Sequence, residues 1–403
     1  MGNKIPVESE FDVRFLKKTK ITFALVYLLF MSARAVFNPF ITVYLKEKGL
    51  DVELIGIIMG INSVIIILAQ PFWGLVSDKL QSEKSALIIC LISQGLVSLL
   101  LITSRGFFLI ALCFCVYTFF SSPEGTLLDT WSLNAIKKVK DEKSLGRLKL
   151  WGCLGFAASS ILSGIFINNR STSDIIPAFS IILLIIAGIM FIIRIDTQRY
   201  RPIKLKEINF SLIYKNKSFL VFLGFVVLMQ FPHRAAYTFY PALLQHLGGS
   251  KNMVGYCSAI MFVSEAILLF LSKKLLANIS AKYLILGSAL FFTLWQIGYA
   301  LSTSPFHIML LSLLDGPSFA LFTIGTLYYL DAIAPKQLRV TYQAIAYAFY
   351  YGISGVIGNT LGGLIIGGFG YRAMYIIGAV SIVLVTMVFI MADRAIEKKQ
   401  EAL

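Results

Sequence analysis

The sequence predicts an all-α polytopic membrane protein with 12 transmembrane helices arranged as two six-helix bundles. Of its 403 residues, 57% are hydrophobic and 14% are charged, whereas soluble domains contain roughly 25% charged residues. Apolar runs of about 20 residues, the length that a helix needs to cross a bilayer, recur along the whole chain. The polar stretches between these runs are too short to form a sizeable soluble domain.

The apolar runs also predict how the chain is divided. We expect spans at residues 21–45, 53–76, 85–104, 107–133, 146–167, 175–194, 218–246, 253–272, 282–302, 306–331, 341–369 and 373–392. The longest polar segment separates six spans from six. It predicts an N-terminal bundle at 1–195, a cytoplasmic linker at 196–217 and a C-terminal bundle at 218–403.

The basic residues predict the orientation in the membrane. Of the 36 Lys and Arg residues, 27 fall in the tails and even-numbered loops, six in the odd-numbered loops and three inside spans. Because cytoplasmic loops are enriched in Lys and Arg, we expect a multi-pass protein of the cytoplasmic membrane with both termini inside. The net charge of +15 therefore belongs to one membrane face and does not indicate a nucleic-acid partner. The polar stretch Met1–Lys20 does not resemble a cleavable signal peptide.

The sequence gives little support to classes of protein other than transporters. All five cysteines lie inside predicted spans, as small core residues do, without the spacing of a disulfide framework or a metal site. The chain has no His-Glu-x-x-His, P-loop or Gly-x-Ser-x-Gly motif, so we expect neither an enzyme nor a cofactor. A membrane receptor or sensor is the alternative class, although the chain offers no soluble output domain. A channel ranks third.

A weak internal repeat relates the two halves. Ser32–Phe37 in the first span resembles Pro232–Tyr237 in the seventh, and each is followed by a short glycine-bearing loop. The match places Arg34 and Arg234 at corresponding positions. Repeated six-helix halves are a transporter architecture, in which the solute binds between the halves near the middle of the membrane.

The loop between the second and third spans carries a recognisable motif. Gln70–Leu80 contains Gly74, Leu75, Asp78 and Lys79 in the order glycine–x–leucine–x–x–aspartate–basic. This stretch resembles the signature loop of the major facilitator superfamily. The resemblance implies a gate on the cytoplasmic side, in which the aspartate pairs with basic residues when the transporter opens outwards.

Further stretches resemble, within that superfamily, the group of the lactose and phenylpropionate permeases, which are proton symporters. The resemblance covers essentially the whole chain and rests on Gln70–Leu80, Gly146–Phe156, Ser264 with Glu265, and Ala334-Pro335 with Arg339 and Gln343.

This resemblance implies roles for five residues. Lys149 falls on the arginine that binds sugar, and Asp129 falls on the carboxylate that pairs with it. Phe156 falls on the tryptophan that stacks on the sugar ring. Glu265 falls on the carboxylate that links sugar binding to the proton, and Asp315 on the histidine of the proton relay.

The sequence also departs from the permease pattern. Lysine at 149 lacks the bidentate geometry of arginine. The glutamate and arginine of the relay fall on Ser318 and Trp295, and a lysine of the eleventh span falls on Gly352. A carboxylate that couples transport to protons is therefore expected, but specificity for lactose is not.

The charged residues inside spans can also be interpreted without the family. Glu265 lies about 18 Å, and Asp315 about 14 Å, along its helix from the start of its span, so both are deep in the membrane. A carboxylate at such a depth is easier to protonate, as a proton symporter requires. The alternative is structural charge balance. Glu124 cannot face the same cavity as Asp129 squarely, so we expect it to serve packing or gating.

For several residues the sequence leaves two interpretations open. Asp129 and Lys149 either line a solute path or cap helices at the membrane surface. Arg34 and Arg234 either clamp an anion or balance the three acids inside spans. His233, beside Arg234, either titrates or is a hydrogen-bonded structural residue.

Together these observations predict a monomeric secondary transporter, driven by the proton gradient, that imports a small polar solute by alternating access. A sugar, oligosaccharide or glycoside is the expected solute. The alternatives are an aromatic or other organic carboxylate held by Arg34 and Arg234, or a nucleoside. The expected partners are the solute, protons and the lipid bilayer.

Overall fold

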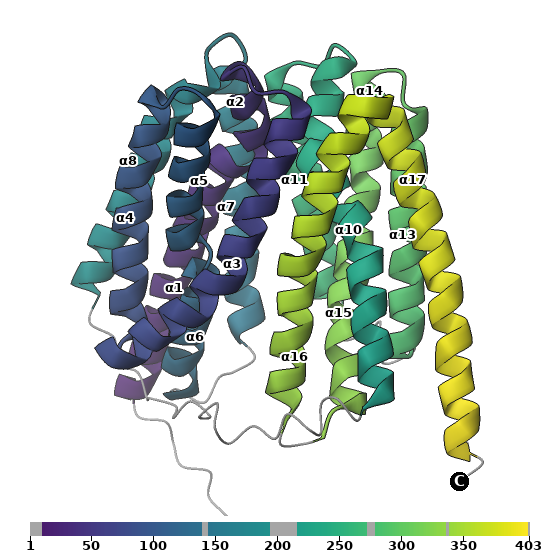
Figure 1. The fold of residues 1–403 in the computed structure, drawn as a ribbon. Coiled ribbons are helices and arrows are strands. Elements are labelled where there is room, and N and C mark those ends of the chain that lie inside the picture. Colours follow the sequence, from purple (N-terminus) through teal and green to yellow (C-terminus); the bar gives the residue numbers. More distant parts are fainter. Residues whose placement is uncertain (1–9, 139–143, 194–215, 272–278, 336–337, 402–403) are drawn as a thin grey trace, which may run out of the picture.

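The computed structural model describes residues 10–138, 144–193, 216–271, 279–335 and 338–401, and every regular element in them is a helix (Figure 1). The first half of the chain contains α1 (Glu10–Phe37), α2 (Ile41–Glu47), α3 (Val52–Leu80), α4 (Glu83–Thr103), α5 (Phe107–Ser121), α6 (Glu124–Lys138), α7 (Ser144–Ile167) and α8 (Ile176–Ile192). Short 3₁₀ turns join α1 to α2 and precede α8.

The second half repeats this plan. It contains α10 (Lys217–His246), α11 (Lys251–Phe270), α13 (Ala281–Leu301), α14 (Pro305–Leu311), α15 (Asp315–Ile333), α16 (Arg339–Ala348) and α17 (Ser354–Glu401). In Figure 1, α1–α8 form one bundle and α10–α17 form a second bundle beside it. The predicted linker, 196–217, lies outside the described residues except for its last two.

The helices account for twelve membrane crossings. Eleven segments of the described chain are long and apolar enough to span a bilayer. The last of them, Thr341–Arg394, has 54 residues and turns back at Gly370, whose φ is 82°, so it crosses twice. The predicted architecture of 12 helices is confirmed, and its span boundaries agree with the helices to within a few residues.

The surface of the bundle is that of a membrane protein. Large apolar side chains such as Phe108, Phe191 and Phe270 are exposed around its outside, whereas several charged and amide side chains are buried within it. This reversal of the usual distribution is expected where lipid replaces water as the solvent.

Two glycines show that the repeat seen in the sequence is structural. Gly49 follows α2 and Gly248 follows α10, and their φ angles are 81° and 86°. A glycine ends a helix in this left-handed conformation without the steric cost that a side chain would add. Corresponding helices of the two halves therefore end in the same way.

The two bundles are in close contact at one end of the molecule. We call this end the opposite face, and we call the other end, where α3, α6 and α15 finish, the basic face. At the opposite face α3 packs on α17, where a Cβ at Gly56 would lie 2.6 Å from the Asn359 carbonyl oxygen. Likewise α7 packs on α11, where Gly255 touches Ser160. Small residues allow such backbone contact between helices.

A polar contact joins the halves at the same face. Glu47, at the end of α2, forms an ion pair with Lys251, at the start of α11. The Glu47 carboxylate also accepts a hydrogen bond of 2.7 Å from the Thr172 backbone N–H, and Lys251 donates to the Arg170 carbonyl oxygen. Charge pairing and helix packing together close this face.

We expect Gly255→Ala to loosen the opposite face, because the added methyl group would clash with the Ser160 carbonyl of α7. The test uses whole cells that express the protein with its five native cysteines replaced and with Thr42→Cys added. A membrane-impermeant maleimide should label this cysteine faster when Gly255→Ala is present than when it is not. Gly224→Ala is the control, since no atom lies within 4 Å of a Cβ there. Equal labelling rates in both backgrounds would contradict the role of this contact.

Candidate functional site

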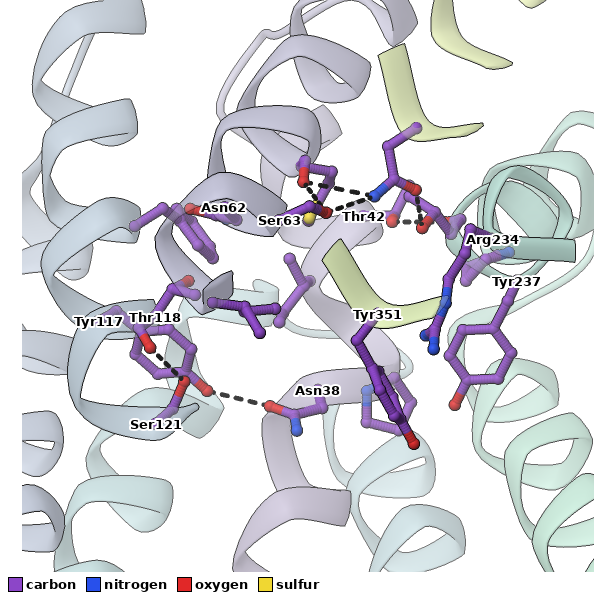
Figure 2. Close-up of a pocket in the computed structure, with 18 of the residues that line it drawn as sticks. Asn38, Thr42, Asn62, Ser63, Tyr117, Thr118, Ser121, Arg234, Tyr237 and Tyr351 are labelled. Atoms are coloured by element: carbon purple, nitrogen blue, oxygen red, sulfur yellow. Dashed lines mark hydrogen bonds between the residues drawn. The ribbon is translucent and has the colours of Figure 1, made fainter. Parts of the chain in front are cut away.

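A cavity of about 260 Å³ lies between the two halves, and we call it the inner cavity. Its polar lining is a ring of amides and hydroxyls with one guanidinium (Figure 2). From the first half come Asn38, Thr42, Asn62, Ser63, Tyr117, Thr118 and Ser121, and from the second half Arg234, Tyr237, Thr238, Tyr240, Tyr351 and Asn359.

Two irregularities in the helices shape this lining. Pro39 interrupts the first span with a 3₁₀ turn, and Asn38 at its start accepts a hydrogen bond of 3.0 Å from the Tyr117 hydroxyl (Figure 2). In the eleventh span a π-helical turn, Phe349–Ile353, separates α16 from α17 and carries Tyr351 to the cavity. Such π turns are frequent at functional sites.

Hydrogen bonds close the inner cavity towards the opposite face. The Thr42 hydroxyl donates to the Thr238 carbonyl at 2.7 Å, and the Thr238 hydroxyl donates to Asn359 Oδ1 at 2.7 Å. The Asn359 amide nitrogen in turn donates to the Met59 carbonyl at 3.3 Å. This chain crosses twice between the halves, so a solute can pass only after the contact between the halves opens.

A second cavity, of about 600 Å³, lies on the side of the basic face, and we call it the vestibule. Gln70, Thr126, Asp129, Thr130 and Lys149 line it from the first half, and Val226, Phe319, Phe322, Thr323, Thr326, Gln343, Tyr347, Tyr350 and Tyr351 from the second. Tyr351 lines both cavities, so its ring stands between them. The molecule is therefore closed at the opposite face and hollow towards the basic face.

The structure brings together Asp129 and Lys149, as the sequence suggested. Lys149 Nζ lies 2.7 Å from Asp129 Oδ2, and the Tyr27 hydroxyl donates to Asp129 Oδ1 at 2.7 Å. The side chains of Lys149 and Asp129 are 47% and 43% exposed on the vestibule wall. Both side chains therefore line the vestibule, and their role in binding solute stays a prediction.

Phe156 lies elsewhere. Its ring stacks on Phe262 of α11 with 4.1 Å between the ring centroids, and it lines neither cavity. In this conformation it packs the two halves together. The ring-stacking role implied by the family resemblance stays a prediction.

The two deep carboxylates lie where α11 crosses α15. Asp315 is 5% exposed and forms a hydrogen bond of 3.0 Å with His233 Nε2, inside the second bundle. Gly316 packs against the backbone nitrogen of Glu265, so the two carboxylates are on touching segments. Within the described chain, Glu265 makes no hydrogen bond or ion pair, whereas Asp315 has its partner in His233.

Arg34 and Arg234 correspond in the sequence but differ in their surroundings. The Arg34 guanidinium lies 5.7 Å from the Phe30 ring centroid and lines neither cavity. Arg234 lines the inner cavity, where Figure 2 shows its guanidinium beside Tyr237 and Tyr351. Both arginines nevertheless act electrostatically on Tyr237 and Tyr351, so their joint role as a clamp stays a prediction.

The motif at the end of α3 lies on the basic face. Asp78 and Lys79 are exposed and form no ion pair with any residue that the structure describes, and Gly74 has no atom near its Cβ position. An unpaired Asp78 is in keeping with a conformation that is hollow towards this face. Its gating role stays a prediction.

Sequence reasoning missed most of the inner cavity. Asn62 and Asn359 are uncharged residues within apolar runs, so no charge marked them. The only signals were the Asn38-Pro39 pair, which predicts a break in the first span, and the tyrosines of the eleventh span. Glu124 lines neither cavity; it is buried beside the Gln94 amide, which donates to its carboxylate at 2.7 Å once the amide oxygen and nitrogen are exchanged to satisfy both groups.

Comparison with known proteins agrees with this geometry. The model of the MFS_1 like family matches residues 20–377. The chain is 24% identical to a maltose permease of Geobacillus stearothermophilus, over 93% of this chain and 95% of that protein. It is 28% identical to a probable 3-phenylpropionic acid transporter of Escherichia coli K12, over 80% and 86% of the two chains.

The fold has a solved counterpart. The crystal structure of the nucleoside transporter NupG superposes with a TM-score of 0.81 at 15% identity, covering 93% of this chain and 98% of that one. At this identity the likeness shows the fold alone. The family match across both bundles establishes that this chain is a membrane transporter, not an enzyme, and that it belongs to the MFS_1 like family of the major facilitator superfamily.

Proposed function

We propose that this protein is a proton-coupled symporter that takes up a sugar, oligosaccharide or glycoside by alternating access. The observation that carries the proposal is the inner cavity, in which amides, hydroxyls and tyrosine rings from both halves surround one space. A sugar presents hydroxyls in many directions, each a donor and an acceptor, and amide side chains supply both functions. Aromatic rings pack against the apolar faces of such a solute.

The proposed path follows the two cavities. The basic face is placed in the cytoplasm because it carries most of the Lys and Arg residues. The structure then represents the state that releases solute inwards through the vestibule. The reverse state requires the Glu47–Lys251 pair and the glycine contacts of the opposite face to separate. Repeated bundles rocking about a fixed central site are the usual way to achieve this.

Glu265 and Asp315 are proposed as the proton-coupling groups. They lie on touching segments of α11 and α15, and only Asp315 has a described partner. A carboxyl group without a fixed partner can be charged when water reaches it and neutral when the surroundings are dry. Solute and proton binding are then linked through the same conformational change.

Asn62→Ala is expected to weaken sugar binding by about tenfold, since a lost hydrogen bond in a buried site costs roughly 1–3 kcal/mol. Asn62 lines the inner cavity, and its Oδ1 is buried without a described protein partner. The measurement is the thermal shift of purified protein with maltose, sucrose, lactose and melibiose, because a ligand of the folded state raises apparent stability.

Ser98→Ala serves as the control, since Ser98 is bonded to Ser180 inside the first bundle and is remote from both cavities. It should leave the ligand-induced shift unchanged. A shift that survives Asn62→Ala at full size would remove the inner cavity as the sugar site.

A further inference from the structure

The Arg234 guanidinium is the one positive charge in the lining of the inner cavity among the described residues. It lies over two tyrosine rings of the π-helical turn, 4.2 Å from the centroid of Tyr350 and 4.5 Å from that of Tyr351. Contact with aromatic faces holds a guanidinium in place while leaving its in-plane N–H groups available.

Two of those N–H groups have no partner. Arg234 Nε and Nη2 are both buried, and neither donates a hydrogen bond to a described protein atom. These two nitrogens form one edge of the guanidinium plane, with parallel N–H bonds spaced to match the two oxygens of a carboxylate. The unpartnered atoms are thus the pair that binds a carboxylate with two hydrogen bonds.

None of the carboxylates that the structure describes inside the spans is bonded to this edge. Asp129 is paired with Lys149, Asp315 is bonded to His233, and Glu124 faces Gln94. Glu265 forms no ion pair with any described residue. A buried charge without a counter-ion is costly, and the cost is relieved when an anion binds.

Resting on the proposed function, we propose that the transported solute carries a carboxylate, which Arg234 binds in the inner cavity. The hydroxyl and amide lining of the first half faces the rest of the solute, so the class is an acidic saccharide such as a uronate or a uronide. In this structure Nε and Nη2 are buried, so the side chains around Arg234 have to rearrange when the anion enters.

Two matched pairs of ligands test the proposal on wild-type protein by competition binding and thermal shift. The first pair is sodium glucuronate and glucose, and the second is 3-phenylpropionate and 3-phenylpropanamide. Within each pair the two compounds differ at one group, which is a charged carboxylate in the first compound and a neutral hydroxymethyl or amide group in the second. We expect glucuronate to bind at least about tenfold more tightly than glucose, since charge-assisted bidentate hydrogen bonds are among the strongest in proteins.

Arg234→Gln should remove this preference and leave glucose binding within about twofold of wild type. Arg234→Lys keeps the positive charge but lacks the two parallel N–H groups of the guanidinium, so part of the preference for glucuronate over glucose should remain. Arg105→Gln, at an exposed arginine outside both cavities, should preserve it fully. The thermal stability of each variant without ligand shows whether it has folded, and the wild-type ligand pairs need no variant at all.

The outcomes separate this inference from the proposed function. Equal binding of glucuronate and glucose overturns the carboxylate site but leaves sugar transport standing. Tight, Arg234-dependent binding of 3-phenylpropionate, with glucuronate and glucose both unbound, supports the carboxylate site and overturns the acidic saccharide as its ligand. A glucuronate preference that persists in Arg234→Gln also overturns the assignment to Arg234. No binding of any of the four compounds overturns the carboxylate site, and the proposed function falls with it only if maltose, sucrose, lactose and melibiose also fail to bind.

Discussion

Replacing Glu265 by Gln is expected to stop proton-driven accumulation of solute while leaving solute exchange across the membrane intact. Gln keeps the size and a hydrogen-bonding head but can no longer gain or lose a proton. Glu265 is on α11, beside Gly316 of α15, and has no described hydrogen-bond or ion-pair partner that would make it structural. Glu265→Gln should therefore impair the coupling of transport to protons but not the folding of the protein.

The measurement compares accumulation with counterflow. In energised vesicles, Glu265→Gln should accumulate no more solute than wild type treated with a protonophore. In vesicles preloaded with solute, it should still exchange labelled for unlabelled solute. Asp51→Asn, an exposed carboxylate just before α3, is the control and should behave as wild type. Normal accumulation by Glu265→Gln would exclude Glu265 as the coupling group.

Asp315→Ala is expected to destabilise the second bundle severely. The Asp315 carboxylate and His233 are 5% and 3% exposed and form a hydrogen bond of 3.0 Å. Removing one partner of a buried pair costs about 3–5 kcal/mol, because the other partner is left without its hydrogen bond in a dry environment. The thermal stability of purified protein and the yield in the membrane should both fall.

Asp315→Asn is the matched variant, because its amide can still bond to His233. It should retain most of the stability and lose coupling if Asp315 exchanges the proton. A double-mutant cycle with His233→Leu checks the contact itself: the second replacement should cost far less than the first. Additive losses would show that the pair contributes nothing as a pair.

The sequence predicted the fold well, because the signals for membrane helices are local and strong. An apolar run such as 218–246 can only be a helix in lipid, and it coincides with α10 (Lys217–His246). The predicted likeness of the two glycine-bearing loops was correct, because Gly49 and Gly248 adopt the same left-handed conformation there. The long apolar segment Thr341–Arg394 contains two predicted spans, and the non-helical Gly370 separates them.

The site was predicted only in part, for physical reasons that differ among residues. Asp129 and Lys149 were found because charges inside apolar runs are rare and these two are only 20 residues apart. Asn62 and Asn359 come together through packing of α3 on α17, a contact between distant segments that a single sequence does not reveal. Neutral amides also leave no trace in the charge pattern.

Arg34 and Arg234 show a further limit of sequence reasoning. The internal repeat places them at corresponding positions and suggested a symmetric pair. Of the two, only Arg234 lines one of the two cavities, and the π-helical turn of the eleventh span places Tyr350 and Tyr351 against it. In the first bundle, the Arg34 guanidinium lies over the ring of Phe30. Pseudo-symmetry therefore fixed the backbone position but not the surroundings of the side chain.

The most direct test of proton-coupled uptake is the external pH of weakly buffered, right-side-out vesicles when solute is added. Maltose, sucrose, lactose and sodium glucuronate are added in turn. With the transported compound, we expect alkalinisation that a protonophore collapses and that Glu265→Gln abolishes, since each solute should carry a proton inwards. Entry of labelled solute with no change in external pH, or with acidification, would contradict the account.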